Sequence, residues 1–196
     1  MNIRAKHLLT ALAIACAAAA CSQSAEPPPP APVQPPPPAP PAPPAPPAAA
    51  TASAELAPTE GNAASGTLVL TAESDGVRIT GSLSGVDPGG THGFHVHETG
   101  DCSAPDASSA GPHFNPGGHP HGHPGQGDHH AGDMPNLVAD DAGALAVDVH
   151  VSGVTLGDGG AADVLGRAIV LHAKADDYAT QPAGDSGPRI ACGVIR

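Results

Sequence analysis

The chain has 196 residues, including 25 prolines, 25 glycines and 12 histidines, but no tryptophan, one tyrosine and two phenylalanines. Seven lysines and arginines against 19 aspartates and glutamates give a formal net charge of −12, which argues against nucleic acid as a partner. With so few aromatic residues the core must consist of small aliphatic side chains, so we expect covalent or metal support for the fold.

The first 20 residues have the pattern of a secretory signal peptide. Arg4, Lys6 and His7 form a short basic start, and an apolar run from Leu8 to Ala20 follows. That run is too short to span a bilayer comfortably, so we expect residues 1–20 to direct export and to be removed.

Cys21 lies where a bacterial lipoprotein would carry its lipidated cysteine. It follows three alanines and precedes Ser22, and a lipid there would anchor the chain to a membrane. The family pattern has leucine where this chain has Ala18, Cys16 is a competing site, and simple cleavage among the alanines is the alternative. We predict lipidation of Cys21 and a periplasmic or cell-envelope location.

Residues 21–56 are predicted to form a tether. Proline and alanine make up almost all of residues 26–50, and such a stretch lacks both the backbone donors and the apolar bulk that a core requires. It should adopt extended polyproline II and act as a semi-rigid spacer. The remaining residues, 57–196, have the size of one domain.

Short alternating apolar runs separated by turn residues predict an all-β domain, an antiparallel sandwich or barrel. Residues 74–76 are expected to turn a first hairpin and residues 140–143 a second one. The expected strands are residues 67–71, 77–83, 93–97, 137–139, 144–151, 167–173 and 190–195.

Two segments interrupt this rhythm. Residues 100–134 and 174–188 are long, polar and rich in glycine and proline, and long loops in a compact domain are usually functional or disordered. The first contains most of the histidines, so we interpret it as functional.

Cys102 and Cys192 are the two cysteines outside the leader, and in an oxidising compartment they favour a disulfide over a metal site.

The histidines outside the leader indicate metal binding. His95 and His97 are two positions apart in an expected strand, so both imidazoles project from the same face. Neutral imidazoles suit copper and zinc, and one carboxylate among them is compatible with zinc. The candidate ligands exceed what one ion needs and therefore imply two; they are His95, His97, His113, His121, His130, Asp133 and His172.

Four segments closely resemble the motifs of the copper/zinc superoxide dismutases, in the same order. They are Gly93–Glu98, Gly111–Pro116, His130–Asp133 and Gly187–Ile195, and the resemblance covers residues 65–196. It implies a Greek-key β-sandwich with two functional loops, a fold known for this family. It also implies an enzyme that converts superoxide to oxygen and hydrogen peroxide by a copper redox cycle, with a structural zinc.

The resemblance assigns a role to each candidate ligand. His113 would bridge the two ions and supply a proton to the peroxide. His121 is preferred to His119 and His123 as the middle zinc ligand because it preserves the family spacing. The implied copper ligands are His95, His97, His113 and His172, and the implied zinc ligands are His113, His121, His130 and Asp133.

Three further roles follow from the same resemblance. Asp176 would link a copper-ligand histidine to a zinc-ligand histidine and fix the orientation of both rings. Arg189 would bind superoxide beside the copper, because a guanidinium stays charged and presents paired donors to a small anion. Cys102 and Cys192 match the family disulfide.

Two rival functions fit these residues less well. His119, His123 and His129 are additional histidines that would suit a copper or zinc buffer on the same fold, but a buffer has no need of Arg189. A zinc hydrolase would require an open coordination position and a separate base, and neither is evident. The oligomeric state is left open, a homodimer being one possibility.

Overall fold

The computed structural model describes residues 49–196. The predictions for residues 1–48, which are the signal peptide, the lipidation of Cys21 and most of the tether, lie outside the described residues. Within residues 49–196, no helix is long and apolar enough to cross a membrane.

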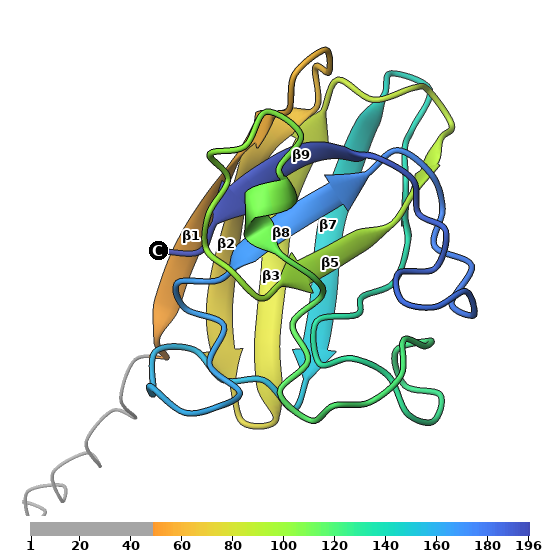
Figure 1. Ribbon diagram of the computed structural model, residues 1–196. Helices are drawn as coiled ribbons and strands as arrows, with labels where there is room; N and C mark the ends of the chain where they lie inside the picture. The colour runs from red at the N-terminus through yellow and green to blue at the C-terminus, as the bar shows by residue number, and fades with distance from the viewer. Residues whose placement is uncertain (1–48) are drawn as a thin grey trace, which may run out of the picture. The chain divides into compact units, whose positions relative to one another are not determined.

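Seven antiparallel strands form one curled sheet in the order β5-β8-β9-β1-β2-β3-β7 (Figure 1). The short strands β4 and β6 pair with each other, and a single 3-10 turn, η1, lies between β5 and β6. The bounds are β1 Thr51–Pro58, β2 Ser65–Glu73, β3 Gly76–Ser84, β4 Thr91–His92, β5 Phe94–His97, η1 Ser108–Ala110, β6 Leu137–Val138, β7 Ala144–Ser152, β8 Ala168–His172 and β9 Arg189–Val194.

Strand β1 turns the sheet into a two-layer sandwich. Residues 51–56 pair with β2, whereas residues 57–58 pair with β9, so β1 passes from one layer to the other. Strands β2, β3 and β7 form one layer with β1, and β5, β8 and β9 form the other (Figure 1). The inward-facing aliphatic side chains of both layers fill the space between them, among them Leu68, Leu70, Ile79, Leu83, Leu145, Ile169 and Leu171. The predicted all-β antiparallel sandwich is confirmed.

The boundary predicted for the tether is wrong. Residues 51–56, placed in the tether by their composition, form most of strand β1 and pair with β2. Ala54 and Leu56 are buried while their neighbours are exposed, which is the alternation of a half-buried strand. The alanines of residues 51–56 give this segment a composition like that of the linker before it, so only its pairing with β2 reveals the strand.

The second predicted hairpin is also wrong, although its turn forms. The amide of Asp140 donates to the carbonyl of Ala144, but β6 pairs with β4 and not with β7. The N–H of Ala139 donates to the carbonyl of Gly90, so the backbone of this segment is already hydrogen-bonded to the residues around β4. Strand β7 pairs instead with β3 along its whole length.

The predicted disulfide between Cys102 and Cys192 is confirmed and closes a separation of 90 residues. Cys192 lies on β9, and Cys102 lies near the start of the loop between β5 and β6. The bond packs with a small apolar cluster that includes Ala107, Ala110 and Val170. It therefore fastens the start of that loop to the layer of β8 and β9.

Replacing both cysteines by alanine should lower the free energy of unfolding by about 4 kcal/mol, because the disulfide restricts the unfolded chain more as the closed loop lengthens. Chemical denaturation of the parent and the variant at matched metal loading measures this difference. Reducing the parent should bring it to the stability of the variant. Equal denaturation midpoints for the oxidised parent and the variant would contradict the prediction.

Candidate metal centre

Two strands and the long loop between β5 and β6 bring seven ligand-type side chains together inside the domain. His95 and His97 come from β5, and His172 comes from the end of β8, which pairs with β5. The loop between β5 and β6 covers β5, where His95 bridges to Asp133 and His97 to His113 through the backbone. All the side chains assigned to copper or zinc from the sequence are buried.

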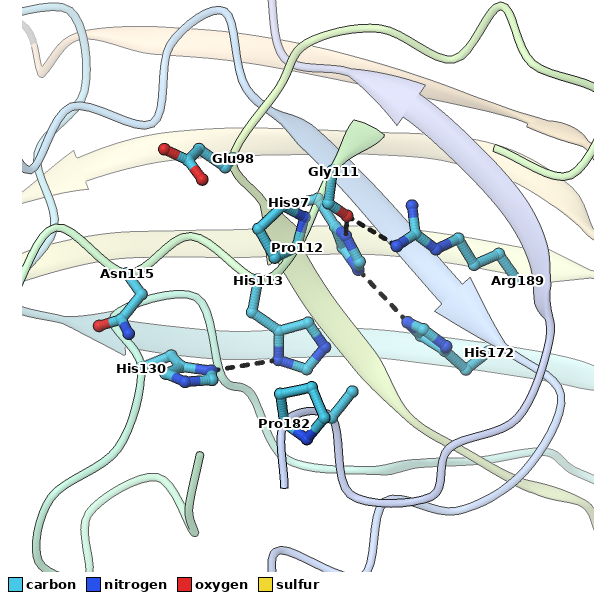
Figure 2. A pocket seen from close by; sticks show the side chains of 11 residues that line it. His97, Glu98, Gly111, Pro112, His113, Asn115, His130, His172, Pro182 and Arg189 are labelled. Atoms are coloured by element: carbon cyan, nitrogen blue, oxygen red, sulfur yellow. Dashed lines mark hydrogen bonds between the residues drawn. The ribbon is translucent and has the colours of Figure 1, made fainter. Parts of the chain in front are cut away.

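The first group contains four histidines whose nearest ring nitrogens lie within 4.8 Å of one another: His95, His97, His113 and His172. The Nε2 atoms of His97 and His172 are 3.4 Å apart. The Nδ1 atoms of these two rings instead face backbone carbonyls, that of Gly111 at 2.8 Å and that of Gly187 at 3.2 Å. These carbonyls fix the two rings and leave both Nε2 atoms available to a metal (Figure 2).

Two ring nitrogens of the first group are buried without any hydrogen-bond partner: Nδ1 of His95 and Nε2 of His113. A buried polar atom without a partner costs free energy, and a metal ion would satisfy both. The ligand chemistry of the group therefore fits copper, which imidazole nitrogens bind well.

The second group consists of His113, His121, His130 and Asp133. Asp133 is its centre, because Oδ1 lies 2.8 Å from Nδ1 of His113, 3.1 Å from Nδ1 of His121 and 3.3 Å from Nδ1 of His130. Its other oxygen accepts the backbone N–H groups of Gly122 and His130. Three imidazoles and one carboxylate are a donor set that suits zinc.

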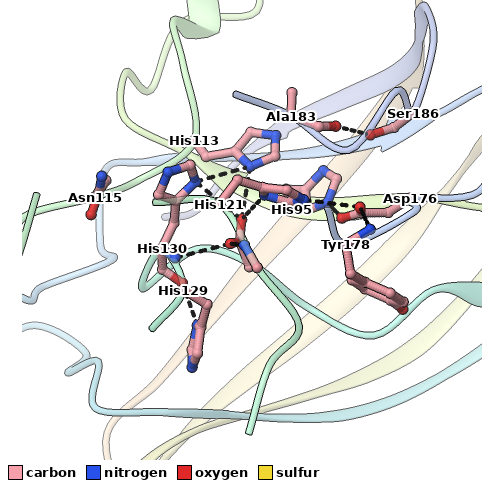
Figure 3. Close-up of polar contacts among 12 residues, drawn as sticks. His95, His113, Asn115, His121, His129, His130, Asp176, Tyr178, Ala183 and Ser186 are labelled. Carbon is pink, nitrogen blue, oxygen red and sulfur yellow. Dashed lines mark hydrogen bonds and ion pairs between the residues drawn. The ribbon is translucent and has the colours of Figure 1, made fainter. Parts of the chain in front are cut away.

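Asp176 joins the two groups from the second long loop (Figure 3). Its Oδ2 lies 2.7 Å from Nε2 of His95, and its Oδ1 lies 2.9 Å from Nε2 of His121. Gly184 closes over this carboxylate with a positive φ of 66°, and a side chain there would collide with Asp176 and His121. The other ring nitrogen of each histidine, Nδ1, faces its own metal group.

Burial lowers the pKa of His95 to about 4 and that of His172 to about 3, and it holds the pKa of His97 well below its ordinary value. These rings are therefore neutral near pH 7, which is the form that binds metals. His121 behaves differently: burial lowers its pKa, but contacts with Asp133 and Asp176 outweigh burial and raise it to about 9. Metal binding at Nδ1 of His121 must consequently displace a proton.

A cavity of about 610 Å³ opens onto the first group and is lined by His97, His113, His172 and Arg189 (Figure 2). Arg189 donates from Nη1 to the carbonyl of Ala107 and from Nη2 to that of Gly111, both at 2.6 Å. These bonds hold the guanidinium at the cavity wall. A small anion entering the cavity would meet the histidines and this positive charge together.

The remaining histidines of residues 49–196 do not join either group. His119 is exposed and lies 3.8 Å from Asp128, and the ring of His123 packs against Tyr178 with centroids 4.4 Å apart. Nδ1 of His129 faces the carbonyl of its neighbour His130. His92 is buried, with Nδ1 2.8 Å from the carbonyl of His172.

Two amide side chains that hold the loops together were not predicted from the sequence. Asn136 accepts the backbone N–H of Asp176 and donates to its carbonyl, and Gln181 makes the same pair of bonds with His121. Each joins residues 40 or 60 positions apart, and neither lies in a motif that indicates a metal site.

Comparisons with known proteins agree with this geometry. The model of the family "Copper/zinc superoxide dismutase" matches residues 64–195. The chain is 44% identical over 148 residues to superoxide dismutase [Cu-Zn] 2 of Aquifex aeolicus, covering 74% of this chain and 86% of that protein. It is 38% identical to the superoxide dismutase-like protein YojM of Bacillus subtilis, covering 72% and 74%. A crystal structure of an SOD-like protein from Bacillus subtilis matches with a TM-score of 0.66 at 37% identity, covering 72% and 95%.

Removing His172 and removing His113 should have different effects on the metals. His172 belongs to the first group alone, so His172→Ala should reduce copper content by more than about tenfold and leave zinc nearly unchanged. His113 belongs to both groups, so His113→Ala should reduce both metals. Elemental analysis of the purified proteins measures this, and equal losses of the same metals in the two variants would contradict the assignment.

The metal-free protein should lose stability as the pH falls from about 6.5 towards 4. His95 and His172 titrate at about 4 and 3 in the folded state and near 6.5 when unfolded, so the unfolded chain binds more protons in this range. His121 acts oppositely: its stabilisation is complete below 6.5 and is lost as the pH rises to about 9.

Urea denaturation of the metal-free protein across this pH range measures the effect. His172→Gln removes one of the buried rings whose pKa is lowered and should flatten the decrease on the acid side. A denaturation midpoint that rises on acidification from about pH 6.5 to 4 would contradict the prediction.

Proposed function

The chain belongs to the copper/zinc superoxide dismutase family, and from that membership we propose how its residues convert superoxide to oxygen and hydrogen peroxide: a copper redox cycle, with a structural zinc joined to the copper site through His113. As a member of this family it is an oxidoreductase that acts on superoxide and uses copper and zinc.

The position of His113 is the observation that carries the proposal. Its Nε2 belongs to the group of four histidines, and its Nδ1 lies 2.8 Å from Asp133 in the second group. A single imidazole thus offers one nitrogen to each group. A metal buffer or a simple structural zinc site would not need two different groups that share a ring.

His95, His97, His113 and His172 would hold copper, and His113, His121, His130 and Asp133 would hold zinc. Bound copper supplies the one-electron chemistry that the reaction requires, whereas zinc has no redox chemistry. The carboxylates of Asp133 and Asp176 contact ring nitrogens of the zinc-side histidines and keep those rings oriented.

His113 also provides a place for a proton. Peroxide must be protonated before it leaves, and Nε2 of His113 is buried, has no hydrogen-bond partner and belongs to a ring that lines the cavity. When it is not bound to copper, this nitrogen can hold a proton and donate it to the product.

Arg189 binds and orients the anion. It is the only lysine or arginine lining the cavity that the described residues form around His113. Because the whole chain carries a net charge of −12, attraction of superoxide must come from this local positive charge together with the metals. Lys174, at the start of the second long loop, is not among the lining residues.

The location of the protein is part of the same proposal. A disulfide persists in an oxidising compartment, which supports export by residues 1–20 to the periplasm or cell envelope. With Cys21 lipidated, the proline-rich residues that follow would hold the domain away from the membrane. Radiolabelled fatty acid incorporated by the parent chain but not by Cys21→Ser would support this, whereas equal labelling would contradict it.

Arg189→Ala should reduce activity by roughly ten- to hundredfold, because a charged hydrogen bond to the substrate contributes about 1.5–3 kcal/mol. Its copper and zinc content should not change, since the guanidinium is not a ligand. Arg189→Lys is the matched control and should recover part of the activity, because it restores the charge but not the paired donors.

Steady-state superoxide consumption at several salt concentrations, with metals measured on the same samples, tests this prediction. The salt dependence should flatten in the alanine variant, since salt screens the attraction between exposed charges. Full activity of Arg189→Ala with both metals in place would show that Arg189 has been misassigned.

A further inference from the structure

Gln181 holds the backbone of His121 with both ends of its side-chain amide. The N–H of His121 donates to Oε1 of Gln181 at 2.9 Å, and Nε2 of Gln181 donates to the carbonyl of His121 at 2.9 Å. The two residues are 60 positions apart, on the two different long loops. The contact is therefore a specific join between the loops, made by a side chain that reaches in from the surface.

His121 depends on this join. It lies in a stretch of the first loop with no helix or strand, and among the described residues its backbone N–H and carbonyl have no hydrogen-bond partner besides Gln181. Its ring is fixed by Asp133 on one side and by Asp176 on the other. Without Gln181, the hydrogen bonds of His121 itself would be limited to those of its ring, and the nearest backbone contact would be that of Gly122 with Asp133.

Gln181 itself sits on a well-supported turn of the second loop. Asp177 accepts the backbone N–H groups of Ala179 and Thr180, and the amide of Gly184 donates to the carbonyl of Thr180. The hydroxyl of Tyr178 accepts the N–H of Asn136, which ties the start of this turn to the end of the first loop. The amide of Gln181 is therefore presented in a fixed position.

The residues next to Gln181 form part of the substrate cavity. Pro182 and Ala183 line it together with His113 and His172 (Figure 2). One short segment thus contacts the backbone of a zinc ligand at Gln181 and forms the cavity wall at the next two residues. A shift of His121 would be transmitted through Gln181 to the wall of the cavity.

We propose that Gln181 is a positioning residue for the zinc site: it sets the backbone of His121 and joins that site to the cavity wall at Pro182 and Ala183. This proposal rests on the assignment of His121 to zinc in the proposed function. Gln181 does not contact the metal or the substrate and acts only through His121.

The zinc dissociation constant of the full chain, loaded with copper and titrated with zinc against a chromophoric chelator, tests the proposal. Gln181→Ala should weaken zinc binding by about tenfold, the lower end of the loss expected when an outer contact of a metal ligand is removed. Thr180→Ala is the matched control, since Thr180 is the adjacent exposed residue and its hydroxyl contacts only Asp177. It should bind zinc as the parent does.

Gln181→Glu is a second variant. It keeps the length of the side chain and an oxygen that accepts the N–H of His121. It replaces the donor facing the His121 carbonyl by an oxygen, so it should also bind zinc more weakly than the parent. With cobalt in the zinc site, the visible absorption bands of both Gln181 variants should shift relative to the parent, and those of Thr180→Ala should not. A general loss of stability would not move these bands selectively.

Parent-like zinc affinity and cobalt spectra in both Gln181 variants would overturn the role of Gln181 and leave the proposed function intact. An equal loss in Thr180→Ala would overturn it too, because the effect would then belong to the loop in general. If His121→Ala binds zinc as tightly as the parent, the assignment of His121 fails, and the role of Gln181 fails with it.

Discussion

The buried carboxylate of Asp176 is the contact on which the arrangement of both loops depends. A charged group removed from water is costly unless it is paired and hydrogen-bonded. Asp176 meets that requirement through Nε2 of His95, Nε2 of His121 and the backbone N–H of Tyr178. These contacts keep its pKa below the ordinary range even though burial raises it. Because the partners come from β5, from the first loop and from the second loop, satisfying this one charge fixes all three segments together.

The sandwich supplies a rigid base for this arrangement but little else of the site. Strand β5 and the end of β8 contribute His95, His97 and His172, whose backbones are held by strand pairing. The zinc-side ligands come from a long loop with only one short 3-10 turn among its described residues. That loop is held by the disulfide at its start and by Asp133 inside it. Asp176 and Gln181 of the second loop, together with Asn136, hold it at its contacts with that loop.

An acidic protein with an anionic substrate needs positive charge concentrated beside the cavity that the substrate enters. The carbonyls of Ala107 and Gly111 hold the Arg189 guanidinium at the cavity wall, and the disulfide ends only three positions further along β9, at Cys192. Gly111 also accepts from His97, so one carbonyl orients both the arginine and a copper-side histidine. The local field at the cavity is thus set by the fold and not by the net charge of the chain.

The sequence by itself determined most of the strands, the disulfide and the family. Alternating aliphatic residues predict strands because successive side chains face opposite sides of a sheet. The motifs contain four of the six histidines that the structure brings into two groups, and His121 and His172 lie between the motifs. The sequence analysis missed strand β1, because its alanines resemble those of the tether. It also paired β6 with the wrong strand, because pairing depends on which other strand the fold brings beside it. Only the tertiary structure decided that Asn136 and Gln181 hold the loops. Each joins residues far apart in the chain through a single amide, and such a contact has no local pattern from which it could be predicted.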